Sequence, residues 1–241
     1  MAPAVTWWRH AQALQANKQV PAAREALAMA YQFMLQGIAS LSDEGLRRNY
    51  LNKIDAHREI VEAWLKDARR RRLSPQRRTA HLVGEANLRE PFERLVDTGL
   101  RLNELRSADE LHDFLIDEAT ELSGAERVLL VLETPQGRKL AGALVPRDED
   151  AATLAGEAAA LFDAVRLSRV ASLDHFPAGA AALEQRSRIV APLVARQSII
   201  GYLYADIDGI FGRFHEADRD LLGMLASQAA VALDNVQWSA S

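Results

Sequence analysis

Residues 188–236 read RIVAPLVARQSIIGYLYADIDGIFGRFHEADRDLLGMLASQAAVALDNV, and this stretch decides the fold. Residues 188–194 and 198–207 are rich in β-forming side chains and predict two strands joined by a tight turn at 195–197. A glycine-containing loop follows, and then residues 215–238 repeat apolar side chains every three or four positions, as one face of a long helix does. The stretch therefore predicts a β-hairpin followed by a helix that packs against it.

The residues upstream continue this mixture of strands and helices. Residues 127–133 (RVLLVLE) predict a buried strand, and turn-forming residues at 134–137 return the chain into a partner strand at 138–145. Three segments then lead to the hairpin, namely a helix, a short strand and a mixture of loop and helix, at 148–164, 165–171 and 173–184.

Two amphipathic helices precede these strands. Asn87 is a candidate N-cap for the first helix. Its inner face repeats at intervals of three or four residues: Phe92, Leu95, Gly99, Leu102 and Leu105. Ser107 and Glu110 have the spacing of a capping box for the second helix, and Gly124 is its expected C-terminal stop. This part of the chain therefore belongs to the α+β class.

The first 85 residues predict helices only. Residues 2–17 and 22–36 predict two helices with alanines at their close-packing positions, and Ser42 is a candidate N-cap for a third. The apolar face of this third helix runs toward Arg72 at steps of four, four, three, four and three: Leu46, Tyr50, Ile54, His57, Val61 and Trp64. On this face, His57 is expected to be a packed, hydrogen-bonded residue rather than a ligand.

Residues 11–31 (AQALQANKQVPAAREALAMAY) resemble one repeat of a tetratricopeptide array. A single repeat of this kind cannot bury its own apolar face, and arrays need about three or more repeats for stability. The resemblance therefore implies that the N-terminal helices dock further repeats or a protein.

Six arginines between residues 68 and 84 mark the expected boundary between two domains, at 1–85 and 86–241: Arg69, Arg70, Arg71, Arg72, Arg77 and Arg78. Arginines complement the negative end of a helix dipole, so we interpret the cluster as a solvated helix end that continues into a linker. The alternative is a patch for nucleic acid or an acidic partner. The net charge of −4 and the lack of aromatic residues among the arginines argue against nucleic acid.

The composition excludes several classes of protein. The 241 residues are 49% hydrophobic and 26% charged, which is ordinary for a globular protein. The absence of cysteine excludes disulfides, thiolate zinc sites, a cysteine nucleophile and a thioether-linked chromophore. No apolar run approaches the roughly 18 residues of a membrane-spanning helix, and the N-terminus lacks the pattern of a signal peptide. A cytoplasmic protein without a membrane partner is expected.

The C-terminal part, about residues 88–238, resembles a GAF domain. In this family an apolar strand with an internal Pro-Leu precedes a strand of Gly-x-Leu type that ends in Asp, and a Phe precedes an acidic helix start. The matching residues occur here in the same order: Pro192, Leu193, Gly201, Leu203, Asp206, Phe214, Asp218, Leu221 and the run at 228–235.

The resemblance implies a six-stranded antiparallel sheet flanked by helices, with a small-molecule cavity on one side. It also implies that the first and last helices form a parallel bundle in a homodimer. The candidate residues for that bundle are Phe92, Leu95, Gly99, Leu102, Leu225 and Leu233. Fold alone does not select among the functions that such domains have.

Three residues of the matching stretch predict features of the structure at their own positions. Pro192 lacks an N–H group, so it predicts an edge or a bulge in its strand. Gly201 predicts a close approach of another backbone, and Phe214 predicts a buried anchor ahead of the last helix.

Catalytic signatures are absent from the sequence. It contains no Gly-x-Ser-x-Gly, no His-Glu-x-x-His and no phosphate-binding loop. The methionine sulfoxide reductases of the superfamily need cysteine, and its bilin-binding members need cysteine or equivalent pocket chemistry, which is not evident here. The cyclic-nucleotide signature of other members finds no convincing alignment, which leaves a cyclic nucleotide open as a ligand without support from the sequence. Asp206, Asp208 and Gly209 resemble the start of a calcium loop but lack its later ligands, so a turn without a metal is expected.

The resemblance places four polar residues near the implied cavity, and these are the candidate ligand contacts: Asp163, Asp174, His175 and Arg188. The cofactor or ligand is left unidentified by the sequence. The leading hypothesis is a non-catalytic sensory module that binds a small molecule and signals through its dimer helices. By resemblance, the output domain, a bacterial nucleotide cyclase or histidine kinase, would lie beyond Ser241. The alternatives are a ligand-free dimerisation and docking module and, third, an enzyme.

Overall fold

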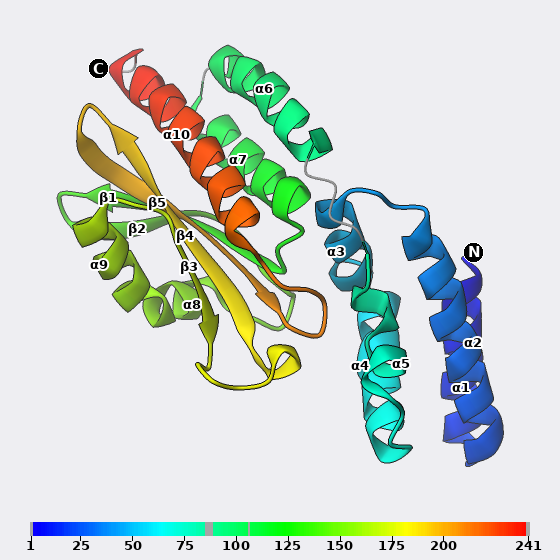
Figure 1. Cartoon of the computed structure of the whole chain (residues 1–241). Helices are drawn as coiled ribbons and strands as arrows, with labels where there is room; N and C mark the ends of the chain where they lie inside the picture. Colours follow the sequence, from blue (N-terminus) through cyan, green and yellow to red (C-terminus); the bar gives the residue numbers. More distant parts are fainter. Residues whose placement is uncertain (1, 85–88, 106, 240–241) are drawn as a thin grey trace. The chain divides into compact units, whose positions relative to one another are not determined.

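The computed structural model describes residues 2–84, 89–105 and 107–239 (Figure 1). The chain divides into two compact units, Met1–Ala86 and Asn87–Ser241. The expected N-cap at Asn87 lies outside the described residues. Among the described residues, no helix is both long enough and apolar enough to cross a membrane.

The N-terminal unit contains helices only. They are α1 (Pro3–Ala16), α2 (Val20–Ala39), α3 (Glu44–Asn52), α4 (Asp55–Arg70), the short α5 (Pro75–Arg78) and the 3₁₀ turn η1 (Ala80–Leu82). Helices α1 and α2 form a close hairpin whose core contains alanines at the expected positions, with Ala23, Ala26 and Ala30 buried. Small side chains let the two helices approach closely.

The prediction of one continuous third helix that runs toward Arg72 is wrong. The helix is interrupted at Lys53 and Ile54, which separate α3 from α4. Ile54 has an extended backbone and is 40% exposed, so it does not lie on a buried face. The N-cap of α3 is also Asp43 rather than Ser42, since the Asp43 carboxylate accepts the N–H of Leu46 at 3.0 Å.

His57 is a packed, hydrogen-bonded helix residue, as predicted. Its Nδ1 donates to the carbonyl of Tyr50 at 2.7 Å, and its ring lies 4.3 Å from the Tyr50 ring. Burial lowers the pKa of His57, an effect that the hydrogen bond to Tyr50 opposes. The imidazole thus stabilises the break between α3 and α4 by binding a carbonyl at the end of α3.

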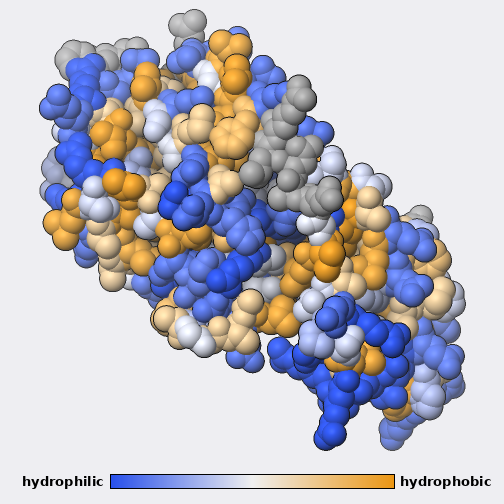
Figure 2. All heavy atoms as spheres, in the orientation of Figure 1, coloured by the Kyte–Doolittle hydropathy of each residue, from blue (hydrophilic) through white to orange (hydrophobic). Residues whose placement is uncertain are grey.

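The arginine-rich stretch begins as the exposed end of α4, as predicted, but continues into two short helical segments instead of a linker. After the last turn of α4, the chain forms α5 and η1, and His81 in η1 is buried against Tyr31 of α2. Their side chains meet at 2.7 Å between the Tyr31 hydroxyl and His81 Nδ1. Figure 2 shows hydrophilic residues gathered around the end of α4 and α5. The exposed arginines there include Arg69, Arg70, Arg72 and Arg77.

The C-terminal unit is a five-stranded antiparallel sheet in the order β2-β1-β5-β4-β3. The strands are β1 (Arg127–Thr134), β2 (Gly137–Leu144), β3 (Ser172–Phe176), β4 (Arg186–Ala195) and β5 (Ser198–Asp208). The expected sixth strand is not found among the described residues. The segment at 165–171, predicted as a strand, instead completes a helix, because Val165 packs beside Phe162 on a helical face.

Helices cover both faces of the sheet (Figure 1). Helices α6 (Arg89–Glu104), α7 (Ala108–Ser123) and α10 (Glu216–Ser239) cover one face, and α8 (Ala151–Glu157) and α9 (Ala159–Ser168) cover the other. A 3₁₀ turn, η2 (Ala182–Glu184), connects β3 to β4. The single helix expected at 148–164 is two helices, with the break at Ala158.

Local predictions for the hairpin and its helix are confirmed. Strand β3 pairs with β4 only as far as Val190, so Pro192 lies beyond it, next to a bulge between Leu193 and Val194. A Cβ on Gly201 would lie 2.5 Å from the Val131 carbonyl oxygen, and Phe214 is fully buried.

The turns and caps follow the same local chemistry. The turn between β4 and β5 contains no glycine, and both Arg196 and Gln197 adopt left-handed conformations (φ 47° and 68°), as a two-residue type I′ turn requires. Ser107 caps α7 as predicted, since its Oγ accepts the N–H of Glu110 at 3.1 Å. Gly124 ends the same helix with φ 67°.

Candidate functional site

A cavity of about 570 Å³ lies on the face of the sheet that carries α8 and α9. Residues of four strands, two helices and the connection between β3 and β4 line it. The lining residues are Arg127, Leu154, Glu157, Ala158, Leu161, Phe176, Pro177, Glu184, Gln185, Arg186, Arg188, Tyr204 and Asp208. The cavity therefore combines an apolar wall with an unusually high density of charged groups.

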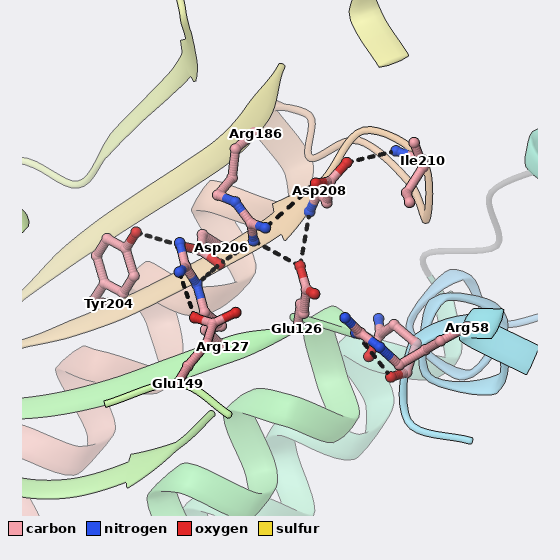
Figure 3. Close-up of polar contacts among 10 residues, drawn as sticks. Arg58, Glu126, Arg127, Glu149, Arg186, Tyr204, Asp206, Asp208 and Ile210 are labelled. Carbon is pink, nitrogen blue, oxygen red and sulfur yellow. Dashed lines mark hydrogen bonds and ion pairs between the residues drawn. The ribbon is translucent and has the colours of Figure 1, made fainter. Parts of the chain in front are cut away.

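Asp206 organises the charged side of the cavity (Figure 3). It is fully buried at the end of β5, where its carboxylate accepts hydrogen bonds from Arg127, Arg186 and Tyr204. Arg127 approaches through Nε at 2.9 Å and Nη2 at 2.5 Å, and Arg186 Nη1 lies at 2.9 Å. One carboxylate thus holds two guanidinium groups and a phenol in fixed positions.

The ionisation of the surrounding groups follows from these contacts. Burial opposes the charge on Arg127, but the hydrogen bonds and negative charge of Asp206, together with Glu149, outweigh it and raise the Arg127 pKa. The pKa of Tyr204 is raised by burial and by the neighbouring Asp206 charge, so its hydroxyl stays protonated and donates. This side of the cavity is therefore a stable ionic network at neutral pH.

Arg186 extends the network toward the end of β5. Its Nη1 donates to Glu126 at 2.6 Å, and its Nη2 lies 3.4 Å from Asp208. Glu126 also accepts the backbone N–H of Asp208 at 3.2 Å, and Asp208 in turn accepts the N–H of Ile210 at 3.0 Å. The segment from Asp206 to Gly209 was expected to be a turn. Its first three residues instead complete β5, and both Asp206 and Asp208 bind arginines.

One of the four predicted ligand contacts, Arg188, lines the cavity, and a second, Asp174, binds Arg188. Two parallel hydrogen bonds from Arg188 join them, at 2.8 Å from Nε and 2.5 Å from Nη2. The Arg188 guanidinium also lies 4.6 Å from the centre of the Phe176 ring. Hydrogen bonding to Asp174 raises the Arg188 pKa against the opposing effect of burial.

The other two predicted contacts lie elsewhere. Asp163 is 66% exposed on α9 and binds Arg138 of β2 at 2.6 Å. His175 does not line the cavity, and its Nδ1 lies 3.0 Å from the hydroxyl of Ser187. Because neighbouring positions of a strand point to opposite faces, His175 faces away from Asp174 and the cavity.

The predicted dimer-helix residues mostly pack inside the unit. Four of them are buried in the contact of α6 and α10 with the rest of the domain: Leu95, Leu102, Leu225 and Leu233. Phe92 is half-buried, and a Cβ on Gly99 would lie 3.2 Å from the side-chain amide of Gln228 on α10. Among the side chains of α6 and α10 that the structure describes, the large apolar ones left exposed are instead Val96, Leu100, Met224 and Val231.

The sequence interpretation missed Arg127, Glu126, Arg186, Glu149 and Tyr204. One signal for them is present, because Tyr202, Tyr204 and Asp206 alternate along β5, and Arg186 and Arg188 alternate along β4. Polar side chains at every second position of an otherwise apolar strand share one face of the sheet. That pattern marks the cavity face but does not say which charges pair.

The fold and its cavity define an α+β domain with an open antiparallel sheet and a cavity of small-molecule size beneath two helices. The model of a protein family described as GAF domain matches residues 107–235, which is more than half of the chain. The chain therefore belongs to the GAF domain family, as its sequence resemblance predicts.

Solved structures with a similar fold include a free methionine-R-sulfoxide reductase from Neisseria meningitidis (20% identity, TM-score 0.47), over 66% of this chain and 97% of that chain. A GAF domain/HD domain protein from Geobacter sulfurreducens is 17% identical (TM-score 0.46), over 57% of this chain and 99% of that chain. A methyl-accepting chemotaxis protein is 17% identical (TM-score 0.45), over 62% of this chain and 99% of that chain. No protein with a curated description matches the sequence.

Proposed function

We propose that the chain is a non-catalytic sensory module whose cavity binds a small molecule and whose α6 and α10 transmit the binding event through a homodimer to an output domain. The observation that carries this proposal is the cavity of about 570 Å³, in the range of ligand sites. Buried polar groups held in place by an ionic network, beside an apolar wall, suit the recognition of one compact molecule.

Filling the cavity tests this proposal. Leu161 and Leu167 both lie on α9, but Leu161 lines the cavity whereas Leu167 is 87% exposed. We expect native mass spectrometry of the purified chain to show a bound small molecule, retained in Leu167→Trp and lost in Leu161→Trp. The larger indole at position 161 would occupy the space of the ligand. Equal retention by both variants would place any bound molecule outside the cavity.

The dimer proposal rests on the exposed apolar side chains of α6 and α10. Val96 and Leu100 are 68% and 64% exposed and lie four residues apart, hence on one face of α6. Burying each side chain in a dimer would contribute about 1.5 kcal/mol or more. A homodimer buries two copies of each side chain, so the double variant Val96→Glu, Leu100→Glu is expected to weaken dimerisation about 10,000-fold, measured by sedimentation equilibrium.

Leu167→Glu provides the matched control, because it places the same charge at an exposed leucine on α9. It should leave the dimer constant unchanged. If the control weakens the dimer as much as the α6 variant does, the interface lies on the α9 side and the transmission route through α6 and α10 fails.

The alternative is a docking module without a ligand, and a groove in the N-terminal unit favours it. This groove, of about 550 Å³, lies between α1, α2 and α4 and has an alanine-rich floor. Residues 1–86 contain 14 Lys and Arg against eight Asp and Glu. A protein partner or further helical repeats would cover the groove. A dimer that carries no bound molecule in the mass spectrum would favour this function.

A further inference from the structure

The charges around the cavity identify the class of molecule that it accepts. We infer that the cavity selects a small organic cation, an amine with a compact apolar body, and this inference rests on the proposed ligand-binding function. Three arginines line the cavity and would by themselves suggest an anion. The hydrogen bonds that these arginines make indicate a cationic ligand instead.

All three guanidinium groups are already bound to carboxylates of the chain. Arg127 holds Asp206 and Glu149, the latter at 2.7 Å. Arg186 holds Glu126 and Asp206, and Arg188 holds Asp174 through two hydrogen bonds. An anionic ligand would have to compete with these carboxylates or lie beside them, and like charges brought together repel.

Two carboxylates that line the cavity have no such partner. The carboxylates of Glu157, at the end of α8, and Glu184, in η2, make no hydrogen bond or ion pair with any residue that the structure describes. The charges still available to a ligand are therefore negative.

The charged residues that line the cavity are three arginines and three carboxylates: Arg127, Arg186, Arg188, Glu157, Glu184 and Asp208. Four further carboxylates bind these arginines from outside the lining: Asp174, Asp206, Glu126 and Glu149. The three arginines and the carboxylates around them therefore carry a net negative charge, which favours a cation in the cavity.

The apolar residues of the lining accept the apolar part of the ligand. They are Leu154, Ala158, Leu161, Phe176 and Pro177. These side chains provide no charge and no hydrogen-bond donor, so they favour an aliphatic or aromatic body. Glu157 and Glu184 belong to the same lining and provide carboxylates for an ammonium group on that body.

Calorimetric titration of the full chain with three matched probes tests the inference. The probes are 2-phenylethylamine, 2-phenylethanol and phenylacetate, which share a phenyl body and differ in charge. We expect the amine to bind at least about 10-fold more tightly than the other two. Since exposed ion pairs contribute up to about 1 kcal/mol each, the double variant Glu157→Gln, Glu184→Gln should weaken amine binding about 10-fold.

Two further variants locate the binding. Glu216→Gln removes an exposed carboxylate of the same domain that does not line the cavity, and it should leave amine affinity unchanged. Leu161→Trp should abolish binding. Amine binding that survives the double glutamine variant unchanged would overturn the inference.

Other outcomes separate this inference from the proposed function. Tighter binding of phenylacetate would overturn the cationic class and still support a ligand-binding cavity. If none of the probes binds and the native mass spectrum shows a co-purified anion, the cationic class is likewise overturned and the ligand-binding cavity is still supported. Binding of none of them and an empty cavity would overturn both.

Discussion

Replacing Asp206 with asparagine is expected to lower the free energy of unfolding by about 3–5 kcal/mol, the cost of removing one partner from a buried ion pair. Asp206 is fully buried, and the side chains of Arg127 and Arg186 that it holds are only 13% and 23% exposed. The neutral amide would leave both guanidinium groups short of the charge that stabilises them. Urea unfolding of the full chain, followed by circular dichroism, measures the loss.

The matched control for this prediction is Asp163→Asn. Asp163 also binds an arginine closely, with 2.6 Å to Arg138, but it is 66% exposed. Water already screens an exposed pair, so this substitution should cost less than about 1 kcal/mol. Equal losses in the two variants would contradict the view that burial gives the Asp206 network its importance.

Gly201→Ala is expected to destabilise the protein by about 3 kcal/mol, because it forces extra volume into a closely packed position. The added Cβ would lie 2.5 Å from the Val131 carbonyl oxygen and 2.9 Å from a methyl carbon of Leu132. Strands β1 and β5 are paired at this point, so the backbone of β1 cannot move without breaking the sheet. Thermal or urea unfolding, measured by the loss of circular dichroism, reports the change.

Gly156→Ala is the opposite case and serves as its control. Gly156 lies within α8, and a Cβ there would meet no atom within 4 Å. Alanine favours a helix over glycine by about 0.8–1 kcal/mol, so this variant should be slightly more stable than the natural chain. A similar loss of stability from both substitutions would show that the space around Gly201 does not decide its identity.

The sequence predicted the hairpin and its helix well, because local rules govern them. The missing N–H of Pro192, the missing side chain of Gly201 and the volume of Phe214 each restrict the structure at one position. The N-cap at Ser107 is equally local. Such features can be predicted without knowing which distant residues meet.

The sequence predictions were wrong where they depended only on the spacing of apolar residues. Ile54 continues a helical pattern in the sequence, yet its backbone is extended and the helix breaks there. Val165 begins a segment of β-forming residues, but its side chain completes the apolar face of α9. Apolar spacing does not show where a helix ends, and short apolar runs suit a strand and a helix about equally.

The site was the least predictable part because its contacts join distant segments. Arg127 and Asp206 are 79 positions apart, and Arg186 and Glu126 are 60 apart. Arg188 and Asp174 could be proposed from the family resemblance, and the structure adds that they bind each other. Only the pairing of β1, β4 and β5 brings the remaining charges together.

The order of the strands also determines how copies of this domain can associate. The outer strands of the described sheet are β2 and β3, and an outer strand with free N–H and C=O groups can recruit a strand from another molecule. Strand β3 has only five residues, and β2 carries the adjacent cations Arg138 and Lys139. Two copies aligned along β2 would bring these cations together, so growth of the sheet into fibrous aggregates is discouraged.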